Sequence, residues 1–134
     1  MKLILIIIFI LIWTRIGMAE SVSLRWDAPT TNMDATPLTD LVGFKIYYGT
    51  TTGVYGTVVD VGYALCKVID GLSAGMTYYF AATAYDTSAN ESGYSNEVSK
   101  LISSGDMGSC DDNSTHLNWR QRHQKSGGFG GGFQ

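Results

Sequence analysis

The chain has little of what catalytic sites are usually built from. Only two of its 134 residues are His, and both, His116 and His123, follow the region that reads as a folded domain. The Ser and Thr residues of that region have no neighbouring base in a motif that would activate a nucleophile. The sequence therefore predicts no catalytic residue, no cofactor and no enzyme activity.

Basic charge and metal-binding patterns are also scarce. Nine Lys and Arg stand against 12 Asp and Glu, and such an acidic excess repels nucleic acid, so we expect no nucleic-acid partner for the folded domain. Two loops hold oxygen-bearing side chains, Asp27, Asp34 and Asp40 in one and Asp86, Asn90 and Glu91 in the other. Neither has the spacing of a calcium loop, and Asp and Asn are common turn formers. His116 and His123 with one nearby Cys are an incomplete zinc set, so no metal site is predicted.

The one long hydrophobic run lies at the N-terminus and is too short to cross a bilayer. Residues 3–13 are apolar, Arg15 interrupts any extension, and a span needs about 20 residues. Small residues up to Ala19 fit a signal peptidase site. We expect a signal peptide over residues 1–19, cleaved after Ala19, and a secreted, periplasmic or cell-surface protein without a stable membrane span. A retained anchor is the alternative.

Helical periodicity is missing from the rest of the chain, which instead alternates in twos. Val22, Leu24 and Trp26 are apolar at every second position, as are Phe44, Ile46 and Tyr48, and later Phe80, Ala82 and Ala84. Turn signals rich in Gly, Thr and Asp separate these runs. Short strands spaced in this way predict an all-β sandwich or barrel.

Four features together resemble a fibronectin type III domain, most closely the bacterial versions. They are Trp26 with Pro29 shortly after it, the strand Phe44-Lys45-Ile46-Tyr47-Tyr48-Gly49, the turn at Gly71-Leu72 leading to Tyr78, and Ser95 to Val98 in the last strand. The resemblance covers residues 20–100. It implies an immunoglobulin-like, seven-stranded β-sandwich that serves as a spacer or binding module without catalysis, here over residues 20–102.

Tyr78 resembles the tyrosine of a tyrosine corner, whose ring covers the core edge while its hydroxyl bonds to backbone upstream. We expect the structural core to include Trp26, Ile46, Tyr48, Leu72, Tyr78 and Phe80. Other tyrosines, Tyr47, Tyr79, Tyr85 and Tyr94, are expected on outward faces or loop ends. There they either stack on sugar or grip a partner, or pack across strands to stabilise the sheet.

The first strand of the family is missing or truncated, because only residues 20–25 separate the cleavage site from Trp26. We therefore expect the strand over residues 22–26 to be an open sheet edge, with Val22 and Leu24 at a possible docking edge. The alternative is that Glu20-Ser21 and a nearby loop, or the segment after Lys100, covers it.

The end of the chain changes in composition. Residues 103–134 are polar, then basic, and end in Gly with Phe129 and Phe133, which predicts a disordered tail that is either inert or adhesive. The two cysteines are Cys66 and Cys110. They form a possible disulfide that would fasten the tail, or remain a buried thiol and a free one.

Two functions are compatible with these features. The first is a non-catalytic exported module that binds protein or carbohydrate at or outside the cell surface. The second is a structural or assembly subunit of an extracellular complex, joined through the open sheet edge and the C-terminal tail.

Overall fold

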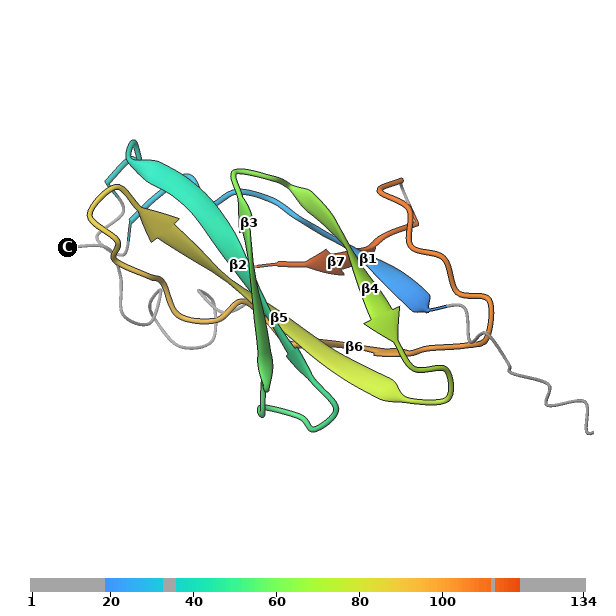
Figure 1. Ribbon diagram of the computed structural model, residues 1–134. Coiled ribbons are helices and arrows are strands. Elements are labelled where there is room, and N and C mark those ends of the chain that lie inside the picture. The colour runs from blue at the N-terminus through green and yellow to red at the C-terminus, as the bar shows by residue number, and fades with distance from the viewer. Residues whose placement is uncertain (1–18, 33–35, 112, 119–134) are drawn as a thin grey trace, which may run out of the picture.

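A computed structural model describes residues 19–32, 36–111 and 113–118, and all regular structure in these ranges is β (Figure 1). The strands are β1 (Glu20–Trp26), β2 (Leu41–Gly49), β3 (Thr57–Gly62), β4 (Cys66–Leu72), β5 (Thr77–Asp86), β6 (Val98–Leu101) and β7 (Thr115–Leu117). Among the described residues no helix has the length and apolar character of a membrane span. The predicted signal peptide lies outside the described residues, apart from Ala19.

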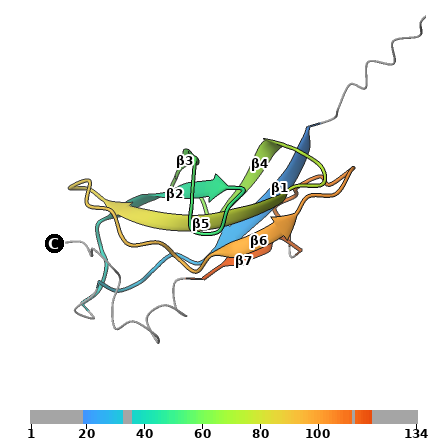
Figure 2. The ribbon, with the colours of Figure 1, turned by 90° about the horizontal axis from the view of Figure 1, so that it is seen from below.

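The strands form two sheets that face each other (Figures 1 and 2). One sheet has the order β4-β1-β7 and the other the order β3-β2-β5-β6. Every pairing is antiparallel except that of β1 with β7, which is parallel. The predicted all-β sandwich is confirmed.

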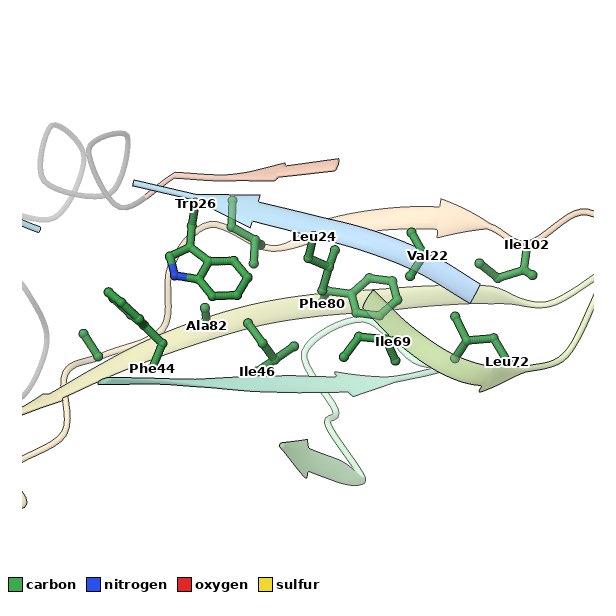
Figure 3. Close-up of a cluster of buried hydrophobic side chains, with 12 residues drawn as sticks. Val22, Leu24, Trp26, Phe44, Ile46, Ile69, Leu72, Phe80, Ala82 and Ile102 are labelled. Atoms are coloured by element: carbon green, nitrogen blue, oxygen red, sulfur yellow. The ribbon is translucent and has the colours of Figure 1, made fainter. Parts of the chain in front are cut away.

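The core lies between the sheets and is built from alternate residues of the strands, as the period of two predicts. Figure 3 labels ten of its members: Val22, Leu24, Trp26, Phe44, Ile46, Ile69, Leu72, Phe80, Ala82 and Ile102. The Trp26 indole is 1% exposed and meets the Phe44 ring edge-on, with 5.8 Å between ring centroids. These two side chains join the sheets at one end of the core.

The six residues expected in the core divide into two groups. Trp26, Ile46, Leu72 and Phe80 are buried, whereas Tyr48 and Tyr78 are half-buried and pack against the buried cluster. The two tyrosines lie at the rim of the core, where both rings contact Phe80 and the Tyr78 hydroxyl accepts a hydrogen bond from the Ser73 N–H.

The open edge expected at Val22 and Leu24 is wrong, because the segment after β6 covers it. β7 runs beside the end of β1, with Leu24 opposite Thr115. Near the start of β1, the Ser21 N–H donates to the Asp106 carbonyl at 3.0 Å. β1 therefore lies between two neighbours, and the alternative in which the segment after Lys100 covers this edge is the one observed.

The domain boundary at residue 102 is also wrong for the described part of the tail. Cys66 and Cys110 form a disulfide with Cα atoms 5.9 Å apart, which fastens residues 103–111 to β4. Further on, the Leu117 side chain is fully buried in the core. The folded unit thus continues to Asn118, and the Gly- and Phe-containing remainder lies outside the described residues.

Candidate functional site

Three tyrosines gather on the outer face of the four-stranded sheet, the face turned away from the core. Tyr47 points outward because its β2 neighbours Ile46 and Tyr48 belong to the core side. Tyr94 lies against it, with ring centroids 5.0 Å apart, and Tyr55 lies 5.1 Å from Tyr94. Both contacts are edge-to-face. We call Tyr47, Tyr55 and Tyr94 the tyrosine cluster.

Tyr94 is held by the irregular segment between β5 and β6. Two buried serines in this segment take the place of ordinary ladder partners: the Ala84 N–H donates to the Ser92 hydroxyl and the Ala82 N–H to the Ser95 hydroxyl, each at 2.9 Å. Tyr94 lies between these two serines in the sequence and points outward, and its side chain is 39% exposed. The most exposed ring of the cluster therefore sits on a fixed backbone.

Small side chains beneath the cluster leave room for its rings. Ala81 is the β5 residue directly opposite Tyr47 and is fully buried although it belongs to the outer face. Thr83, two residues on, is 3% exposed. The outer face at this point is covered by the cluster and by the segment between β5 and β6.

Glu91 connects the outward side chains of β2 and β5. Its Oε2 lies 2.6 Å from Lys45 Nζ, and its Oε1 accepts hydrogen bonds from the hydroxyls of Tyr47, at 2.5 Å, and Thr83, at 2.6 Å. Charge-assisted hydrogen bonds of this kind are among the stronger ones in proteins. Glu91 thereby fixes the orientation of the Tyr47 ring.

The protonation of this group follows from its contacts. Burial raises the pKa of Glu91, but hydrogen bonds from Lys45, Thr83 and Tyr47 together outweigh burial and bring the pKa below its ordinary value of 4.5. The hydrogen bond to Glu91 raises the pKa of Lys45. Both groups are charged at neutral pH, so Glu91 is an acceptor there and not a proton donor.

Glu97 fixes the loop that carries Tyr55. Its carboxylate accepts hydrogen bonds from the Thr52 hydroxyl at 2.6 Å, the Gly53 N–H at 2.7 Å and the Tyr55 hydroxyl at 2.7 Å. Gly53 has a φ of 70°, a conformation that glycine adopts without strain. The two carboxylates, Glu91 and Glu97, thus hold two of the three rings in place.

The four outward tyrosines named from the sequence do not form one group. Tyr47 and Tyr94 belong to the cluster, whereas Tyr85 lies under Lys45, with Nζ 5.6 Å from its ring centroid, and donates to Asp60 at 3.0 Å. Tyr79 lies in β5 opposite Gly49 and Ser99. Sequence reasoning missed Tyr55, which stands in a Thr- and Gly-rich turn.

The acidic loops are held by hydrogen bonds within the chain. Asp86 accepts from the backbone N–H groups of Ser88 and Asn90 and from the Asn90 side-chain amide, which closes the turn after β5. His116 lies 3.6 Å from Asp27. In the part of the chain that the structure describes, no three His, Cys, Asp or Glu side chains are grouped so as to hold a metal ion. Asp34 and His123 lie outside it.

Comparison with known proteins gives one informative similarity. No protein-family model matches the chain, and no solved structure matches it. Over 85 residues, 63% of its length, the chain is 34% identical to Chitinase D of Niallia circulans. The matched stretch is 14% of that protein, so the similarity concerns a region about the size of one domain in a much larger enzyme.

Proposed function

We propose that the chain is an exported, non-catalytic module of the fibronectin type III type that binds carbohydrate through the tyrosine cluster. The family assignment is supported by the two-sheet sandwich, the buried Trp26 and the partial likeness to Chitinase D. It is further supported by Tyr78, whose hydroxyl oxygen accepts a hydrogen bond from the Ser73 N–H at 3.2 Å. That contact runs to backbone upstream, as in a tyrosine corner.

The tyrosine cluster is the observation that carries the proposal. Tyrosine rings offer an apolar surface with a hydroxyl at the edge, which suits the apolar face and hydroxyl rim of a sugar. The rings of Tyr47 and Tyr55 are positioned by Glu91 and Glu97, so little ordering entropy remains to be lost on binding. Because the relative is named for action on chitin, chitin is the first ligand to test.

A binding role fits this surface better than a chemical one. Glu91 accepts hydrogen bonds from three side chains and has a lowered pKa, the reverse of what a general acid needs near neutral pH. Glu97 is engaged by the β2–β3 loop. We therefore assign both carboxylates to positioning the tyrosines.

Export is supported by the disulfide between Cys66 and Cys110, since such bonds persist mainly in oxidising compartments. This agrees with a signal peptide over residues 1–19. The alternative function, an assembly subunit joined through an open edge, has lost its main support because β7 pairs with β1 from Leu24 to Trp26 and the Asp106 carbonyl accepts the Ser21 N–H near the start of β1.

Depletion of the protein from solution by insoluble chitin tests the proposal. We expect the parent protein to bind and Tyr94→Ala to bind at least about fivefold more weakly, because this change removes the most exposed ring of the cluster. The matched control is Tyr63→Ala, which removes a ring that is 63% exposed and lies against Phe44, outside the cluster. Failure of the parent to bind, or equal binding by Tyr94→Ala, contradicts the proposal.

A further inference from the structure

A hollow of about 340 Å³ opens at one end of the sandwich, beside the loop between β2 and β3. The side chains that form it come from the end of β2, this loop and the starts of β3 and β5: Tyr48, Thr50, Thr51, Val54, Thr57 and Tyr78. It is distinct from the tyrosine cluster, to which none of these side chains belongs.

Two aromatic rings and the Val54 side chain form the apolar part of the hollow. Tyr48 and Tyr78 are half-buried, with ring centroids 6.4 Å apart and planes inclined at 55°. Both rings also contact Phe80, at 5.7 Å and 6.3 Å, in stacked arrangements. Because Phe80 is fully buried, the two tyrosine rings rest on the core and have fixed positions.

The remaining lining supplies hydroxyl groups and no charge. Thr50, Thr51 and Thr57 each carry a hydroxyl that both donates and accepts hydrogen bonds. None of the lining residues is acidic or basic. An ion that entered would lose hydration without gaining a charged partner, so the lining favours a neutral ligand with one apolar face and several hydroxyl groups.

The loop beside the hollow is shaped before any ligand arrives. A Cβ on Gly49 would lie 2.3 Å from the Val54 carbonyl oxygen, so glycine is required for the close approach of the two chain segments. The Val54 N–H donates to the Thr51 carbonyl at 3.1 Å, and Glu97 accepts three hydrogen bonds from the next residues of the loop. A preformed site of this kind avoids much of the ordering cost of binding.

We infer that this hollow is a sugar subsite that takes one neutral pyranose unit, with N-acetylglucosamine as the test case. Its volume lies near the lower limit of the roughly 300–1,000 Å³ typical of small-molecule sites, which suits one unit and not an extended oligosaccharide. The inference rests on the proposed carbohydrate function and adds a second place of contact to it. The rings of Tyr48 and Tyr78 provide the apolar contact, and the threonines provide the hydrogen bonds.

Titration of the purified protein with N-acetylglucosamine, followed by amide chemical shifts in NMR, tests the inference. We expect saturable shifts at the amides of Gly49, Thr50, Thr51 and Thr57. Thr57→Val removes a hydroxyl at nearly constant volume and is expected to weaken binding at least about fivefold. Thr87→Val, an exposed change outside the hollow, is the matched control and leaves the affinity unchanged. Glucosamine and glucuronate, which are charged, should produce no saturable shifts at these amides.

The outcomes separate this inference from the broader proposal. Absence of saturable shifts at the hollow, or equal affinities of Thr57→Val and the parent, overturns the subsite even if chitin binding through Tyr94 is found. Shifts confined to Tyr47, Tyr55 and Tyr94 also overturn it while supporting the tyrosine cluster. Saturable shifts at the hollow in a protein that does not bind chitin support the subsite and contradict the proposed function.

Discussion

At the scale of single residues, Tyr78 combines two roles that can be separated by mutation. Its ring packs with Tyr48 and Phe80, and its hydroxyl oxygen accepts the Ser73 N–H across the turn between β4 and β5. The ring contributes burial, and the hydroxyl fixes the path of the chain from one sheet to the other.

Tyr78→Phe keeps the ring and removes the hydroxyl. We expect the free energy of unfolding to fall by about 0.5–1.5 kcal/mol, the usual contribution of one hydrogen bond. Denaturant unfolding of the variant and the parent measures the difference, with Tyr63→Phe as the control at an exposed ring. Coincident unfolding curves for Tyr78→Phe and the parent would mean that the hydroxyl does not stabilise this corner.

Glu91 gives the stability a defined pH dependence. Its pKa in the folded protein is lowered from 4.5 by hydrogen bonds that outweigh burial, so its stabilising contribution is present above pH 4.5 and disappears as the pH falls through the lowered value. Lys45, whose pKa is raised, stays protonated across this range. Asp86, whose pKa is also lowered, adds a second acid-dependent contribution of its own.

Glu91→Gln should therefore destabilise the protein by about 1–2 kcal/mol at pH 7 and by progressively less below pH 4.5. The acid dependence that Asp86 contributes is common to both proteins and cancels in the comparison. Unfolding free energies of parent and variant from pH 7 down to pH 3 measure the difference. A difference that stays constant or grows on acidification contradicts the assigned role of Glu91.

Some of these residues were predictable from the sequence and others were not. Alternation in twos identified Trp26, Ile46 and Phe80 as core residues, because burial follows directly from strand periodicity. Tyr55 and Glu97 gave no such signal, since they lie 42 residues apart and meet only through the tertiary fold. Contacts made by loops depend on how strands are brought together, and local pattern does not encode that.

At the scale of elements, β7 is the part of the fold that sequence reasoning missed. Three residues flanked by Ser, Asn and Asp carry too little pattern to be recognised as a strand. The element forms because β1 offers it an unpaired edge, the disulfide holds the preceding residues nearby, and Leu117 fills a place in the core. The sequence names the segment after Lys100 as one possible cover for the β1 edge, but it does not predict that this segment forms a strand.

Leu117→Ala tests whether β7 is part of the folded unit. Removal of a fully buried leucine side chain from a core should lower the free energy of unfolding by about 2–5 kcal/mol. Met107→Ala, in the same segment but 80% exposed, is the matched control and should change it by less than about 0.5 kcal/mol. Equal stability of the two variants would mean that residues 103–118 are an appended tail and not part of the folded unit.

The disulfide between Cys66 and Cys110 should contribute strongly because it closes a long loop. Because the two cysteines are 44 positions apart in the sequence, restriction of the unfolded chain predicts about 4 kcal/mol of stabilisation. Guanidinium unfolding with and without reductant measures how much the free energy of unfolding falls when the disulfide is reduced. The double variant Cys66→Ala, Cys110→Ala is the control and should be insensitive to reductant, because the chain has no other cysteines. Coincident curves for the parent under both conditions contradict the expectation.

At the scale of the whole molecule, the two sheets have different roles. The β4-β1-β7 sheet carries the disulfide and incorporates the segment after β6, so its features are explained by stability. The outer face of the β3-β2-β5-β6 sheet carries the tyrosine cluster, positioned by Glu91 and Glu97. We therefore assign ligand contact to the outer face of the β3-β2-β5-β6 sheet and to the hollow beside its β2–β3 loop, and stability to the β4-β1-β7 sheet.

Hydrogen exchange of the protein, free and bound to insoluble chitin, tests this assignment most directly. We predict that binding slows exchange in peptides covering residues 45–57 and 91–97, which hold the tyrosine cluster, its two carboxylates and the loop beside the hollow. Exchange in β1, β4 and β7 should stay unchanged. Protection that appears on the β4-β1-β7 sheet, or bound protein with no change at residues 45–57 and 91–97, would contradict binding through the tyrosine cluster.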